Sequence, residues 1–269
     1  LTREQGGWPT FAPSPLPFAP GHPTPIDASE TEIDMIVQHF ASAAKRAVTA
    51  GFEVVELHMA HGYLLHQFLS PISNMRLDEF GGDWENRVKL PLLVAKEVRK
   101  VWPEKWPVFV RISATDWVEG GWDLPQAVRF AKALKEIGID LIDCSSGGLV
   151  HNAKFPTGPG FQVPFAEAIR KEADIATGAV GFITDAHQAD EIISGEKADA
   201  VFLARQLLRD PYWPLHAAKI LGIETAWPRQ YTRAKQREET TKNAKRHEKG
   251  KAGVCQLRNK PFRVFSCIS

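Results

Sequence analysis

The chain has 269 residues, which suits a single α/β barrel of about 250 residues better than two average domains. Its 43% hydrophobic content is enough for a sizeable core, and its formal net charge of +1 does not favour nucleic acid or an anionic membrane as a partner. No apolar run reaches the roughly 18 residues that cross a bilayer, and the start LTREQGGWPTF has no secretory signal pattern. Three scattered cysteines exclude a disulfide framework or a cysteine zinc site, so a reducing, cytoplasmic location is expected.

Residues 1–28 are rich in proline and are expected to form an extended arm laid over a domain surface. Ser29 and Glu32 have the spacing of a helix capping box, and apolar residues then recur at helical intervals until Gly51 ends the helix. The segment 52–57 has the length and β-branched content of a buried strand. The chain therefore enters its folded part through one amphipathic helix and one strand.

The same alternation then repeats down the chain. Helices are predicted near residues 84–101, 124–137, 163–172, 185–194 and 212–221, and strands at 108–113, 141–146, 175–180 and 200–205. This order predicts an α/β fold with a parallel sheet and outer helices. Five strand–helix units are present where a closed (β/α)8 barrel has eight, so a five-stranded doubly wound sheet stays open as the alternative.

The tail differs in composition from the rest of the chain. Residues 234–269 contain many lysines and arginines and show no helical stripe, which predicts a flexible basic appendage to a folded domain at 1–233. A solvated tail is the simpler interpretation, and an arm that binds nucleic acid is the alternative.

Two histidines and a tyrosine follow the first predicted strand, where parallel α/β folds place their working residues. His58 and His61 can direct two neutral imidazoles at one acceptor, such as a carbonyl or nitro oxygen that gains negative charge during reduction. Gly62 allows a tight turn, and Tyr63 supplies a weakly acidic proton. A structural hydrogen-bonding role is equally open, whereas a metal site is disfavoured because no third ligand has a suitable spacing.

Cationic and small residues follow later strands. Arg111 lies within an apolar strand and needs a partner, either an anionic ligand or a buried carboxylate such as Asp116 or Asp143. Gly181 follows one strand, and Ala204 and Arg205 end the next. Small residues there let backbone N–H groups approach a phosphate, and a guanidinium adds a bidentate donor, so a phosphate site is predicted.

The segment His58–Arg87, HMAHGYLLHQFLSPISNMRLDEFGGDWENR, closely resembles the Old Yellow Enzyme family, in its bacterial, thermophilic-like branch of ene-reductases. FVRISATDWVEGGW, LIDCSSGG, PGFQVPFAEAIR, TGAVGFIT and LARQLLRDPYWP extend the resemblance over residues 8–233. It implies a (β/α)8 barrel that binds FMN, takes hydride from NADPH or NADH and reduces activated alkenes such as enones, enals, maleimides and nitroalkenes. The present chain would hold the last five units, because three strands precede this segment in the family.

Residue roles follow from the same resemblance. His58 and His61 would bind the substrate's electron-withdrawing oxygen, and Tyr63 would donate the proton. Flavin contacts would come from Arg111, and phosphate contacts from Gly181, Ala204 and Arg205; glycine is frequent in the family where Ala204 stands. Arg233 matches an arginine that reaches a neighbouring subunit's site, which implies a homo-oligomer, although this chain continues for 36 residues beyond it.

Two alternatives accompany this interpretation. One is a truncated, flavin-free barrel that acts as a binding or assembly partner. The other is a flavin dienoyl reductase, which the scattered cysteines disfavour because such enzymes carry iron–sulfur cysteines and a further domain.

Overall fold

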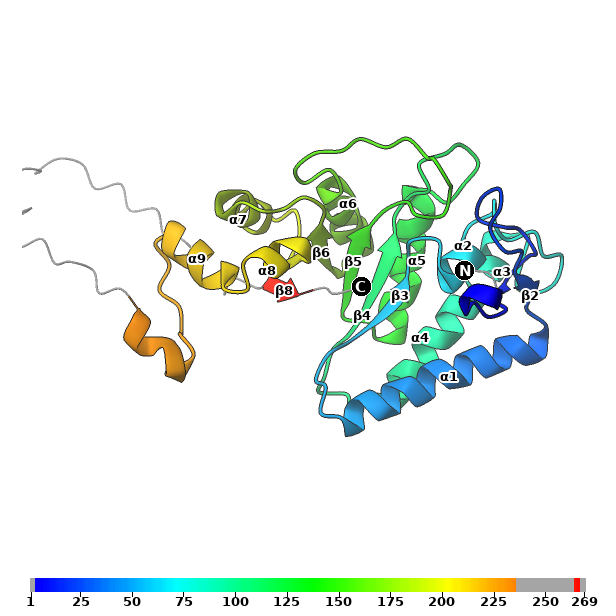
Figure 1. Cartoon of the computed structure of the whole chain (residues 1–269), viewed down its shortest axis with the longest axis horizontal. Helices are drawn as coiled ribbons and strands as arrows, with labels where there is room; N and C mark the ends of the chain where they lie inside the picture. Colours follow the sequence, from blue (N-terminus) through cyan, green and yellow to red (C-terminus); the bar gives the residue numbers. More distant parts are fainter. Residues whose placement is uncertain (1–2, 236–263, 267–269) are drawn as a thin grey trace, which may run out of the picture.

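The computed structural model describes residues 3–235 and 264–266 (Figure 1). Its centre is a parallel sheet of six strands in the order β3-β4-β5-β6-β7-β8. The strands are β3 (Val55–Met59), β4 (Val108–Ser113), β5 (Leu141–Ser145), β6 (Ala176–Val180), β7 (Ala200–Leu203) and β8 (Val264–Ser266). Neighbours in the sheet follow the order of the chain, without the reversal that a doubly wound sheet contains, so that alternative is wrong.

Helices connect the strands and pack on one face of the sheet. They are α1 (Glu30–Thr49), α2 (Leu64–Leu69), α3 (Trp84–Arg87), α4 (Lys89–Val101), α5 (Leu124–Ile137), α6 (Val163–Ala173), α7 (Ala186–Ser194), α8 (Arg205–Arg209) and α9 (Trp213–Ile220). Local sequence sets several ends. Ser29 caps α1 in a complete capping box with Glu32, as predicted, and Asp123 caps α5 by accepting a hydrogen bond from Gln126 N.

The two faces of the sheet carry separate apolar clusters. The helix-facing side belongs to the main core and includes Leu57, Val110, Ile112, Ile142 and Val201. The opposite, inner face has a smaller cluster of Phe109, Leu141, Ala200 and Phe202. Because side chains alternate along a strand, the residues two positions after Phe109 and Leu141 face the same inner side. These are Arg111 and Asp143, so a polar layer adjoins the inner apolar cluster toward the carboxyl ends of the strands.

The N-terminal arm is more ordered than an extended arm. It contains a short 3-10 helix, η1 (Arg3–Gln5), and a two-stranded parallel sheet of β1 (Phe11–Ala12) and β2 (Ile26–Asp27). Arg76 fastens the arm by donating to the carbonyl oxygen of Ala28 at 2.6 Å, and Met75 N donates to Ser14 Oγ at 2.8 Å. These long-range contacts, rather than local propensity, order the arm, so the sequence pattern did not reveal them.

Three predicted boundaries were wrong. The first strand spans Val55–Met59, not 52–57, so His58 is paired within β3 instead of following it. The single helix predicted at 84–101 is two helices, α3 and α4, that meet at Val88. The strand predicted at 200–205 ends at Leu203, and Arg205 begins α8.

The predicted basic appendage lies mainly outside the described residues, at 236–263 and 267–269. Its described part includes β8, which the sequence did not predict and which pairs in parallel with β7. Among the described residues, no helix is both long and apolar enough to cross a membrane.

Candidate active site at the carboxyl ends of the strands

A row of ionisable side chains crosses the inner face of the sheet. His58 of β3 is in register with Arg111 of β4, and Arg111 with Asp143 of β5. Arg111 is buried, and its Nε lies 3.3 Å from Asp143 Oδ2. Of the two carboxylates considered as structural partners of Arg111, the structure selects Asp143.

The charge of Arg111 acts on the carboxyl groups of the buried Asp143 and the half-buried Glu56. Burial raises the pKa of Asp143 well above its ordinary value; the neighbouring Glu56 raises it further, and Arg111 opposes the shift. Burial likewise raises the pKa of Glu56, again opposed by Arg111. The Arg111 guanidinium thus stabilises the ionised forms of two carboxyl groups, which burial disfavours.

The His58, His61 and Tyr63 rings form one cluster at the carboxyl end of β3. The ring centroids of His58 and His61 are 5.1 Å apart, and those of His58 and Tyr63 are 5.4 Å apart. Tyr63 is 64% exposed, so its hydroxyl is open to a ligand or to solvent. The structure therefore brings together all three residues of the predicted substrate-binding set.

Left-handed backbone at His61 and Gly62 makes this cluster possible. His61 has φ 59° and Gly62 has φ 76°, and a non-glycine residue adopts such a conformation only at an energetic cost. A Cβ atom on Gly62 would lie 2.3 Å from the carbonyl oxygen of Gly148, so backbone from the β5–α6 loop presses directly on the turn. Gly62 is required here both for its conformation and for the absence of a side chain.

Both histidines are held in the neutral state. Burial lowers the pKa of His61 to about 3, with further lowering by Arg111, His58 and His66. Burial also lowers the pKa of His58, followed by the charges of Arg111 and His66. The His61 ring is fixed by a contact of 2.7 Å between its Nε2 and Ser145 Oγ. A neutral imidazole can still donate one N–H to an anionic acceptor, so the pair can stabilise developing negative charge without being protonated.

The predicted phosphate-binding residues lie at the ends of two adjacent strands. Val180 of β6 is in register with Phe202 of β7, which brings Gly181 near Ala204 and Arg205 along the same sheet edge. A Cβ atom on Gly181 would lie 2.8 Å from Gln162 Nε2 and 3.0 Å from the Phe161 ring. Arg205 is exposed, with its guanidinium carbon 5.4 Å from the centre of the Phe182 ring. Gly181 is therefore packed closely against Gln162 and Phe161, and Arg205 supplies a cation at the same sheet edge.

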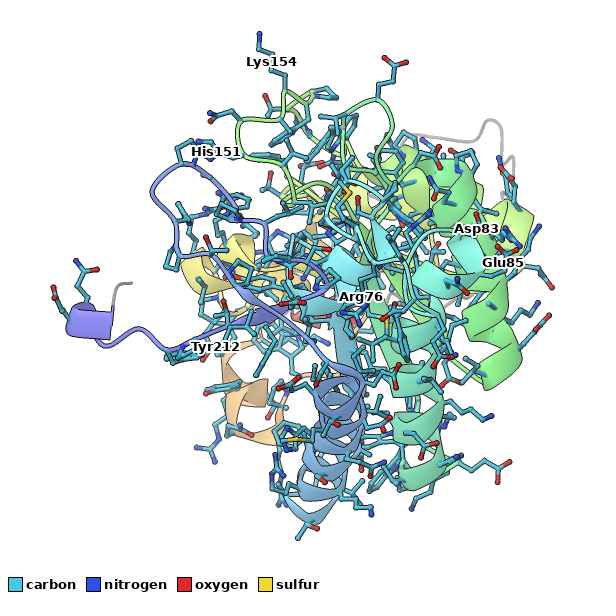
Figure 2. All side chains as sticks on the ribbon, turned by 90° about the vertical axis from the view of Figure 1, so that its right-hand side faces the viewer. Arg76, Asp83, Glu85, His151, Lys154 and Tyr212 are labelled. Carbon is cyan, nitrogen blue, oxygen red and sulfur yellow. The ribbon has the colours of Figure 1, made fainter. Side chains whose placement is uncertain are left out.

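Aromatic side chains that the sequence motifs did not indicate as site residues line the same edge. Trp117 and Phe161 lie on either side of Phe155, with centroid distances of 6.2 and 6.0 Å, and Phe182 lies 6.0 Å beyond Phe161. Trp117 and Phe182 have positive φ, at 62° and 52°, which is rare for bulky residues. The signal available in the sequence was the repeated aromatic residue after a strand end, in TDWVEGGW, FPTGPGF and GFIT. The middle of the loop after β5 carries exposed side chains, with Lys154 directed outward (Figure 2).

Arg233 is the one predicted site residue that the structure does not bring to this edge. It lies in η2 (Arg229–Ala234), which extends away from the sheet (orange in Figure 1). No group of three metal-ligating side chains occurs within the described part of the chain.

Comparisons with known proteins agree with this geometry. Residues 21–224 match the NADH:flavin oxidoreductase / NADH oxidase family. The chain is 51% identical over 223 residues to NADPH dehydrogenase of Bacillus subtilis (strain 168) and 50% identical over 223 residues to NADPH dehydrogenase of Geobacillus thermodenitrificans (strain NG80-2). Both matches cover 83% of this chain and 65% of the relative, so the chain spans about 65% of the length of these relatives.

Solved structures give the architecture. Morphinone reductase superposes with a TM-score of 0.66 at 28% identity over 82% of this chain and 62% of the other. A 2-naphthoyl-CoA reductase complex superposes with a TM-score of 0.73 at 24% identity over 80% of this chain and 33% of the other, which supports the fold alone. The sheet order and these likenesses define a partial (β/α)8 barrel.

The chain belongs to the NADH:flavin oxidoreductase / NADH oxidase family. The resemblance to Old Yellow Enzymes and the barrel fold expected from it are confirmed.

Proposed function

We propose that this chain carries the substrate-polarising part of an FMN-dependent NADPH dehydrogenase of the ene-reductase type. The observation that carries the proposal is the ring cluster of His58, His61 and Tyr63 beside the buried, inward-facing Arg111. The family match and the NADPH dehydrogenase relatives support the same activity.

The described residues fit FMN at two points. Arg111 supplies a buried cation on the inner face, where a flavin ring that becomes anionic on reduction needs one. Gly181 supplies a backbone position that no side chain could share with Phe161 and Gln162, and Arg205 an adjacent cation. Arg111 would hold the flavin, and Gly181, Ala204 and Arg205 its phosphate. When bound, FMN would carry hydride from NADPH or NADH to the β-carbon of an activated alkene.

The chain's own residues then have distinct tasks. Neutral His58 and His61 donate ring N–H groups to the carbonyl or nitro oxygen of an enone, enal or nitroalkene, and so stabilise its developing negative charge. Exposed Tyr63 donates a proton from its hydroxyl to the α-carbon. Ser145 keeps the His61 ring oriented by holding its Nε2, which leaves Nδ1 for the ligand.

The proposal also includes a homo-oligomeric state and a cytoplasmic location. Arg233 is exposed at η2 and would contact the site of a second copy in a homo-oligomer. The buried free thiol of Cys144 suits a reducing compartment, which supports the cytoplasm as the location.

Phenol binding tests the role of the histidine pair. A phenolate placed over oxidised flavin produces a long-wavelength charge-transfer absorbance, and its oxygen mimics the substrate oxygen. His58→Ala in the FMN-loaded protein is expected to weaken phenol binding about 10-fold or more, because one hydrogen bond to a charged group is lost. His39→Ala, on the outer surface of α1, is the matched control.

The pH dependence of phenol affinity gives a second test of the histidine pair. Since the pKa of His61 is lowered to about 3, its ring is expected to stay neutral between pH 5 and 8. The pKa of His58 is lowered from its ordinary value of 6.5, so at and above neutral pH phenol affinity should follow only the ionisation of the phenol itself. An unchanged affinity in His58→Ala, or a wild-type titration above pH 6.5 that His58→Ala removes, would contradict the assigned role.

A further inference from the structure

A buried histidine that the proposed mechanism does not use lies directly beneath the ring cluster. His66, in α2, is fully buried, and its Nδ1 accepts a hydrogen bond of 2.9 Å from the backbone N–H of Gly62. A ring nitrogen that accepts a hydrogen bond carries no proton, so the neutral ring has its proton on Nε2. The contact thus defines one tautomer of His66.

A buried carboxylate faces the other side of the His66 ring. His66 Nε2 lies 2.9 Å from Asp116 Oδ1, and both side chains are 0% exposed. The second oxygen, Asp116 Oδ2, accepts hydrogen bonds from Ser70 Oγ at 2.6 Å and from the backbone N–H of Trp122 at 2.7 Å. These donors come from the end of α2 and from the β4–α5 loop, so the carboxylate is anchored from two directions and fixes the ring that faces it.

In the turn at His61 and Gly62, side chains accept the hydrogen bonds of the two backbone N–H groups. The N–H of His61 donates to Ser113 Oγ at 3.0 Å, and the next N–H, that of Gly62, donates to His66 Nδ1. Both residues have left-handed backbone, so no regular secondary structure supplies their acceptors. The turn is therefore held on one side by Ser113 of β4 and on the other by His66 of α2.

We propose that His66, oriented by Asp116, is a positioning residue that holds the Gly62 amide and thereby the His58, His61 and Tyr63 rings in their ligand-binding arrangement. The inference deepens the proposed function and rests on it for its link to substrate. Its structural content, one tautomer and one acceptor for Gly62, stands on the contacts alone.

Two conservative variants separate the contact of His66 with the Gly62 amide from its contact with Asp116. In His66→Asn, Oδ1 can take the place of Nδ1 and accept from Gly62, but the side chain is too short to reach Asp116. In His66→Gln, Nε2 can take the place of the ring Nε2 and donate to Asp116, but the Gly62 amide loses its acceptor. If the Gly62 contact positions the rings, phenol affinity in the FMN-loaded protein falls about 10-fold or more in His66→Gln and stays within about 3-fold of wild type in His66→Asn.

The thermal midpoint is measured on the same samples, because a purely structural role predicts a different pattern. Equal losses of phenol affinity in the two variants, or losses that follow the thermal midpoint and not the Gly62 contact, would overturn the proposal. So would unchanged affinity in both.

A second readout needs no flavin. The ¹⁵N resonances of His66 in the isotope-labelled full chain are expected to show an unprotonated Nδ1 and a protonated Nε2. A proton on Nδ1, or a mixture of tautomers, would overturn the proposal even if phenol binds. Conversely, a wild-type protein that takes up FMN but binds no phenol would contradict the proposed function, while the ¹⁵N result would still decide how His66 holds the turn.

Discussion

Replacing Gly62 with alanine is expected to lower the free energy of unfolding by more than about 3 kcal/mol and to abolish phenol binding. The added Cβ would lie 2.3 Å from the carbonyl oxygen and 2.9 Å from the carbonyl carbon of Gly148. Neither atom can move without shifting the β5–α6 loop, because Gly148 in turn lies against the backbone of His61. The substitution therefore disturbs both loops that carry the site.

Gly51→Ala is the matched control for this effect. Gly51 also has positive φ, at 88°, but nothing lies within 4 Å of the position where its Cβ would stand. Its substitution measures the conformational cost alone, about 1 kcal/mol. Urea denaturation followed by circular dichroism compares the two variants. Similar losses of unfolding free energy in the two variants would show that the close contact between Gly62 and Gly148 contributes little to stability. That result would contradict the close packing of the two loops.

Arg111→Met is expected to destabilise the folded chain by about 3–5 kcal/mol at neutral pH, because it leaves the buried Asp143 and the half-buried Glu56 without the cation that favours their ionised forms. A carboxyl group whose pKa is higher in the folded than in the unfolded state makes folding less favourable as pH rises above the unfolded value, near 4. Loss of Arg111 raises the pKa of Glu56 and Asp143 further. The deficit of Arg111→Met should therefore grow as the pH rises through the raised folded-state pKa values of these two groups, and shrink as the pH falls below them.

Asp143→Asn removes the carboxyl group of the pair and leaves the Arg111 cation in place. Burial and Glu56 raise the pKa of Asp143, so a neutral amide removes an unfavourable ionisation, and Glu56 still interacts with the buried Arg111; Asp143→Asn should therefore cost less stability at pH 8 than Arg111→Met. The double variant Arg111→Met/Asp143→Asn should recover part of the loss. A pH-independent deficit in Arg111→Met, or a strongly destabilised Asp143→Asn at pH 8, would contradict this description of the buried charges.

Local signals in the sequence account for much of the fold. The bounds of α5 were predicted correctly, because Asp123, a proline in the first turn and Gly138 mark its ends. The capping box of α1 was equally clear. The start of β3 was misplaced because segment 52–57 has the length and β-branched content of a strand, yet Phe52 is 60% exposed and Glu56 and His58 face inward. An inner polar layer lacks the apolar signature by which buried strands are located.

The pairings that the sequence did not predict depend on contacts between residues that are far apart in the chain. The pairing of Arg111 with Asp143 and not Asp116 depends on strand register, which spacing within one strand does not define. The contact between His66 and Asp116 joins residues 50 positions apart, and only the packing of α2 against the β4–α5 loop reveals it. The pairing of β8 with β7 connects segments about 60 residues apart, and no local pattern announced it.

Flavin uptake by the purified full chain tests the central claim most directly. After incubation with excess FMN and removal of free flavin by gel filtration, the protein fraction is expected to keep the blue-absorbing flavin band. Gly181→Val should lose this band, because its side chain would enter the space next to Phe161 and Gln162, whereas Gly158→Val, with nothing within 4 Å of its Cβ position, should retain it. A wild-type protein that folds and yet elutes without flavin would contradict the account and favour a flavin-free binding role.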